Sequence, residues 1–94
     1  MADERPAPED LLEQFGRLKV TDILFSTMST IAQLGYAKLG EGARDLPQAK
    51  VAIESLQALL PVLEGNAPEE ALRDYRQVVA NLQLAYAEAA AASP

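Results

Sequence analysis

The sequence contains no cysteine, no histidine and no tryptophan, and only 5% of its residues are aromatic. Without cysteine the chain has no disulfide framework, no thiol nucleophile and no thiolate metal site. Without histidine it has no imidazole base and no histidine-ligated metal. We therefore expect no metal, no cofactor and no enzymatic activity, because the usual pairs of nucleophile and base are missing.

Positive charge is also scarce, with 8 basic against 14 acidic side chains and a net charge of −6. Nucleic acids and anionic membrane surfaces are bound by clustered Lys and Arg, and the basic residues here are scattered, so we expect neither partner. The most apolar window, residues 20–39, carries Asp22 and Lys38 and is too polar to span a bilayer. The charged start of the chain, residues 1–6, lacks the apolar stretch of a signal peptide, so we predict a cytoplasmic protein.

Alanine and leucine are abundant, at 17 and 14 of the 94 residues. Both are strong helix formers, and a chain of this length supports one domain with a modest core. We therefore predict an all-α protein. Its single domain, residues 20–92, is expected to be a three-helix up-down-up bundle, preceded by a flexible or weakly helical lead at residues 1–19.

The three expected helices cover residues 21–39, 46–63 and 67–91. The second and third helices begin with related motifs, Asp-Leu-Pro-Gln at residues 45–48 and Asn-Ala-Pro-Glu at residues 66–69. In each motif the Asx side chain can accept a bond from a free N–H group of the first turn, and proline occupies a position where its missing donor is harmless. These motifs predict two capped helix starts.

Other residues predict where the helices begin and end. Thr21 or Asp22 is expected to cap the first helix, and Gly40 to end it. Gly65 is expected to adopt the left-handed conformation after the second helix. Pro61 is expected to kink or fray the last turn of that helix.

The apolar faces of the helices suggest a partner. The third helix has a single apolar stripe, whereas the first is apolar over roughly 220° of its circumference and the second carries an extra stripe; a helix in a small bundle needs little more than about 100°. Because a monomer rarely leaves a large apolar patch bare, we predict a non-enzymatic interaction module that forms a homodimer. The predicted contact residues are Phe25, Met28, Ile31, Leu34 and Tyr36.

Other partners could cover the same surface. The N-terminal segment 9–19 could fold back and complete a monomeric core, or an unidentified second protein could bind. Alternatively, the chain could carry an apolar small molecule or a lipid tail between its helices.

Two further patterns are better explained by structure than by chemistry. The Gly40-x-Gly42 pattern follows a predicted helix and lacks the Lys-Ser/Thr of a phosphate loop. Glu70 and Asp74 have the spacing of paired metal ligands, but the di-metal motif also requires histidine. Acidic residues at a helix start are favoured by the helix dipole in any case.

Several short motifs resemble a known family. They are Leu34-Gly35, the segment Ala-Lys-Val-Ala-Ile-Glu-Ser-Leu-Gln-Ala-Leu at residues 49–59, Gly65-Asn66, Glu69-Glu70, and Leu82 followed by Tyr86. Across residues 20–88 the chain is similar to the small bacterial family called domain of unknown function 1844. The resemblance implies a bacterial, cytosolic, all-helical protein, and it supplies no activity, substrate or cofactor.

The chain departs from the pattern of that family in polar positions. Pro-Val-Leu-Glu at residues 61–64 stands where members tend to have Lys-Thr, Ala67-Pro68 replaces a threonine, and Gln83 replaces a common arginine. Any family function carried by those polar side chains would be absent here.

Overall fold

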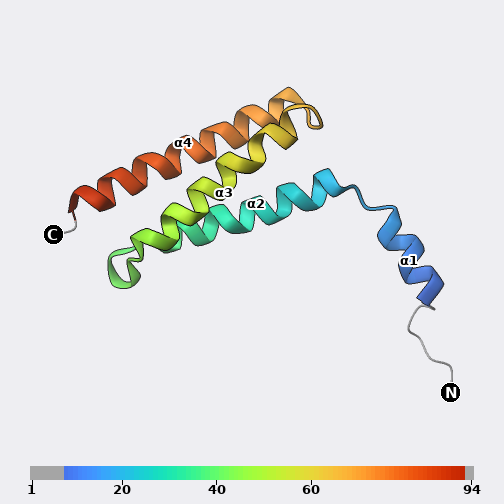
Figure 1. Ribbon diagram of the computed structural model, residues 1–94, viewed down its shortest axis with the longest axis horizontal. Coiled ribbons are helices and arrows are strands. Elements are labelled where there is room, and N and C mark those ends of the chain that lie inside the picture. The colour runs from blue at the N-terminus through green and yellow to red at the C-terminus, as the bar shows by residue number, and fades with distance from the viewer. Residues whose placement is uncertain (1–7, 93–94) are drawn as a thin grey trace, which may run out of the picture.

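The computed structural model describes residues 8–92, and these residues contain helices and no strand. The helices are α1 (Pro8–Gly16), α2 (Val20–Ala37), the 3-10 turn η1 (Glu41–Ala43), α3 (Leu46–Glu64) and α4 (Glu69–Ala92). Figure 1 shows α2, α3 and α4 lying side by side, with α1 apart from them. The predicted all-α class is confirmed.

The start of α2 differs from the prediction. Lys19 is the N-cap residue, with no side-chain cap, and the helix begins at Val20. Thr21 and Asp22 lie inside the first turn, so the prediction that one of them caps the helix was wrong. Asp22 still favours this end of the helix, because its negative charge lies near the positive end of the helix dipole.

The two Asx-Pro motifs behave differently. The Asp45 carboxylate accepts a hydrogen bond of 3.2 Å from the backbone N–H of Gln48, as predicted for the start of α3. The side-chain amide of Asn66 instead donates to the carbonyl of Val62 at 2.7 Å. Asn66 therefore satisfies the C-terminal end of α3, and the prediction that it caps α4 was wrong.

The helix ends do not use left-handed glycines. No described residue has a positive φ, and Gly65, the C-cap of α3, has φ −102°. The predicted left-handed stop at Gly65 was therefore wrong. The Leu63 carbonyl accepts bonds from the backbone N–H groups of Asn66 and Ala67, at 2.9 and 3.0 Å, which closes the turn with ordinary backbone angles. The helix continues through Pro61 to Glu64.

The core lies between α2, α3 and α4, which pack against one another in all three pairs. The largest fully buried side chains are Met28, Leu56, Leu63, Leu72 and Leu82. Leu56, Leu63, Leu72 and Leu82 lie on the apolar stripes of the second and third predicted helices, whereas Met28 was predicted as a contact residue. The other buried side chains include several alanines. A core of small and aliphatic side chains lets the helices approach closely.

The outer shape is extended. The radius of gyration is 17.9 Å, whereas a compact domain of this length has about 12 Å. Two features account for part of the difference: α4 is long, and α1 stands away from the bundle (Figure 1). The packed helix pairs do not include α1. The predicted N-terminal lead, residues 1–19, lies partly outside the described residues, and its described part consists of α1 and the joining residues 17–19.

Candidate interaction surfaces

Large apolar side chains are exposed on every helix of the described chain. Four of them belong to α1 or to the segment that joins it to α2, namely Leu11, Leu12, Phe15 and Leu18, and Val20 is the first residue of α2. Those of the bundle itself are Ile23, Leu34, Tyr36, Val51, Val62, Val78 and Leu84. Single exposed apolar residues are ordinary on protein surfaces, so the question is where these side chains form continuous surfaces.

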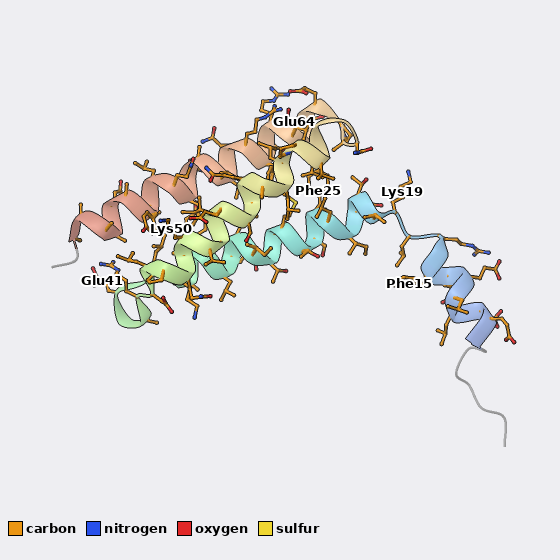
Figure 2. All side chains as sticks on the ribbon, viewed as in Figure 1. Phe15, Lys19, Phe25, Glu41, Lys50 and Glu64 are labelled. Carbon is orange, nitrogen blue, oxygen red and sulfur yellow. The ribbon has the colours of Figure 1, made fainter. Side chains whose placement is uncertain are left out.

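The first continuous surface is the apolar stripe of α1. Leu12 and Phe15 are 73% and 74% exposed, and Leu11 and Leu18 are about half exposed. At 100° per residue the three side chains of α1 itself, Leu11, Leu12 and Phe15, share one side of the helix, and Leu18 follows in the joining segment. Phe15, labelled in Figure 2, lies clear of the other helices. These residues belong to the segment that could fold back onto the core, and in the structure α1 is not among the packed helix pairs.

The second surface, which we call groove 1, is a hollow of about 270 Å³ between α2 and α4. Its apolar lining includes Phe25, Met28 and Val78, and the ring of Tyr75 also borders it. Asp74 is its one charged lining residue. The lining of groove 1 is therefore mostly apolar, with one acidic side chain.

The third surface, groove 2, is a smaller hollow of about 150 Å³ between α2 and α3. Ile31, Leu34 and Val51 supply large apolar side chains, and Lys38 is the one charged lining residue. Leu34 and Val51 are 56% and 53% exposed. Lys38 makes no ion pair with any residue in the described part of the chain.

The structure separates the five predicted contact residues. Phe25 and Met28 line groove 1, Ile31 and Leu34 line groove 2, and Tyr36, which is 42% exposed, lines neither. Met28 is only 1% exposed and packs in the core. The five side chains therefore do not form one patch, because they point to opposite sides of α2.

Sequence reasoning had a signal for some of the exposed residues outside the predicted set. Val51 and Val62 belong to the extra stripe predicted on the second helix, and both are 53% exposed. Leu84, which is 61% exposed on α4, lies outside every stripe and had no such signal.

Tyr75 is the buried polar side chain beside groove 1. It is 8% exposed, and its hydroxyl donates to the backbone carbonyl of Leu56 at 2.5 Å, which ties α4 to α3. Desolvation by burial raises the pKa of Tyr75 to about 12. This hydrogen bond is structural, and no described side chain beside it offers an imidazole or thiol for acid–base work.

This pKa shift predicts a loss of stability at high pH. Above pH 10 the unfolded chain releases the phenol proton, whereas the folded chain holds it until about pH 12. The free energy of unfolding should therefore be independent of this group below pH 10 and fall as the pH rises from 10 to 12. Urea unfolding across this range should show the fall in the wild type and a shallower one in Tyr75→Phe.

The same substitution has an effect at neutral pH. Tyr75→Phe removes the hydrogen bond to Leu56 and should cost about 1 kcal/mol there. Tyr36→Phe, at an exposed site, is the control and should keep the wild-type stability at neutral pH. An unchanged slope in Tyr75→Phe above pH 10 would contradict the assignment.

No cluster of three potential metal ligands exists among residues 8–92. Within the same range, no helix combines the length and apolar character needed to cross a membrane.

The chain was compared with protein families, curated proteins and solved structures. No family model, no curated protein and no solved structure matches it significantly. The resemblance to domain of unknown function 1844 therefore stays a prediction from the sequence, and the function must be argued from the surfaces.

Proposed function

We propose that this protein is a non-enzymatic helical interaction module that associates with a second copy of itself. The observation that carries the proposal is the apolar surface of α2 and α3 around groove 2, where Leu34 and Val51 are more than half exposed. Burying such surface contributes roughly 25 cal/mol per Å². In the proposal an up-down-up bundle presents α2 and α3 together on one side and forms a cytoplasmic homodimer.

The size of the exposed surface supports this proposal. The chain has an accessible surface of 6900 Å², whereas a compact monomer of its mass exposes about 5300 Å². A standard interface covers about 800 Å² on each partner. The chain can therefore lose such an area on association and still expose as much surface as a compact monomer.

Light scattering after size-exclusion chromatography tests the proposal. Over loading concentrations of ~1 to ~100 μM, the range in which standard interfaces are occupied, the mass should rise toward twice the monomer value of 10.1 kDa. A mass that stays at the monomer value at the highest concentration would overturn it.

A matched pair of variants locates the surface. Leu34→Glu places a charge in the centre of groove 2 and should weaken dimerisation at least tenfold, because an unpaired carboxylate would be desolvated. Leu84→Glu makes the same change at a similarly exposed site on α4 and should leave the dimer unchanged. Equal effects of the two variants would show that the interface lies elsewhere.

Groove 1 supports a second candidate function, the binding of an apolar small molecule or lipid tail. Its volume of about 270 Å³ is slightly below the usual range of ligand pockets, roughly 300–1000 Å³. Native mass spectrometry of protein purified from its own host should then show a co-purifying mass that is lost in Val78→Glu. Absence of any bound mass would count against this function.

A further inference from the structure

We infer that α1 is an exchanged arm: the apolar stripe of α1 in each copy docks into groove 2 of the other copy. This inference rests on the proposed self-association and names the segment and the surface through which it occurs. Three features support it: the short length of α1, the distance that α1 can span within its own chain, and the charges that line the two grooves.

The helix α1 requires a docking site in order to be stable. It has nine residues, and isolated helices shorter than ~12 residues are marginal in water. Most helical stability in proteins comes from packing of an apolar face. On α1 that face is unpacked in the single chain, with Leu12 and Phe15 about three-quarters exposed.

The helix α1 can extend only part of the way along α2 of its own chain. Three residues, 17–19, join α1 to α2, and nine helical residues span about 14 Å. If α1 folded back along its own α2, its far end would lie near residue 29. Groove 2 includes Leu34 and Lys38, which lie farther along the helix, so a chain's own arm cannot fill it.

The charged lining residue of each groove distinguishes groove 1 from groove 2 as a site for α1. Glu9 and Asp10 flank the apolar stripe of α1 on its two sides. Groove 1, the groove within reach of a chain's own arm, is lined by Asp74 and would repel them. Groove 2 is lined by Lys38, which has no ion-pair partner among the described residues and would attract them.

The dimensions of α1 and groove 2 also agree. The part of α2 that lines groove 2, from Ile31 to Lys38, is about 10 Å long, and the stripe of α1 can cover it. An antiparallel pairing of two copies brings the start of each α2, with its arm, toward the Lys38 end of the other. The two contacts are then equivalent, as two-fold symmetry requires.

A charge exchange between two full-length variants tests the inference. One variant carries Lys38→Glu, which gives an acidic arm and an acidic groove. The other carries Glu9→Lys and Asp10→Lys, which gives a basic arm and a basic groove. Each variant alone should dimerise about tenfold more weakly than the wild type, because both symmetric contacts become repulsive. Circular dichroism checks that each remains helical.

The mixture of the two variants is the decisive sample. In a heterodimer every arm meets a groove of opposite charge, so an equimolar mixture should dimerise close to wild-type strength. Native mass spectrometry should find heterodimers well above the statistical half. Lys50→Glu is the control, because Lys50 is exposed on α3 and lines neither groove; mixed with the basic-arm variant, it should give no preferential pairing.

The possible results separate this inference from the proposed function. A monomeric wild type overturns both. A dimeric wild type whose charge variants pair as strongly as the wild type overturns the arm and leaves self-association standing. Weakened variants that mixing does not restore would show that no charge pairing between arm and groove joins the two copies, which overturns the exchange.

Discussion

Leu82→Ala is expected to lower the free energy of unfolding by about 3 kcal/mol, in a range of 2 to 5 for buried leucines. Leu82 is 0% exposed at the centre of the bundle, where its side chain lies against Gly35 of α2. Removing three carbon atoms leaves a cavity that rigid helices cannot fully close, so the lost contacts are not replaced.

Leu84→Ala is the matched control for this core substitution. Leu84 lies two residues farther along the same helix and is 61% exposed. Leucine and alanine are both good helix formers, so the change should stay within about 0.5 kcal/mol. Urea unfolding at one fixed protein concentration measures both. Equal losses for the two variants would mean that the core does not lie where the structure places it.

Gly35→Val is expected to cost about 3 kcal/mol or more, or to prevent folding. A Cβ atom built on Gly35 would lie 3.0 Å from the Cβ of Ala52 and 3.2 Å from a methyl group of Leu82. Ala52 is a short side chain that cannot rotate away, so α2 and α3 would have to separate. Valine adds two further methyl groups at the same point, which is overpacking of a close helix contact.

Gly65→Ala is the control for the glycine substitution. A Cβ atom at Gly65 would meet nothing within 4 Å, and its φ of −102° suits any residue. The change should therefore alter the unfolding free energy by less than about 0.5 kcal/mol. A loss near 1 kcal/mol would instead indicate the left-handed conformation that the sequence predicts. Thermal and urea unfolding of Gly35→Val and Gly65→Ala measure both changes in unfolding free energy.

Local sequence signals were most reliable where one residue type serves one local purpose. The Asp45 cap could be predicted because its carboxylate bonds a backbone group only three residues away. The Asn66 prediction used the same logic and was wrong, because the end of α3 competes for the same side chain through the Val62 carbonyl. The sequence motif alone does not show whether a polar side chain between two helices bonds to the end of the first helix or to the start of the second.

The candidate interaction surfaces were predictable only in part. The excess apolar perimeter of the first two predicted helices corresponds to exposed Leu34, Val51 and Val62. Which of these side chains share a groove depends on how α2 and α3 are rotated against each other, and helix periodicity does not contain that rotation. Because periodicity does not give the rotation of a helix, Met28 was predicted as a contact residue, whereas in the structure it lies in the core.

The sequence by itself determined the all-α class, the approximate helix ranges and the inward stripe of α4, because these follow from helix propensity and from the 3.6-residue period within short segments. Tertiary structure alone decided that α1 is not among the packed helix pairs, that Gly35 is the tight contact beside Ala52, and that one groove carries Asp74 and the other Lys38. These features arise where residues distant in sequence meet, so they depend on the packing of whole helices and not on any local pattern.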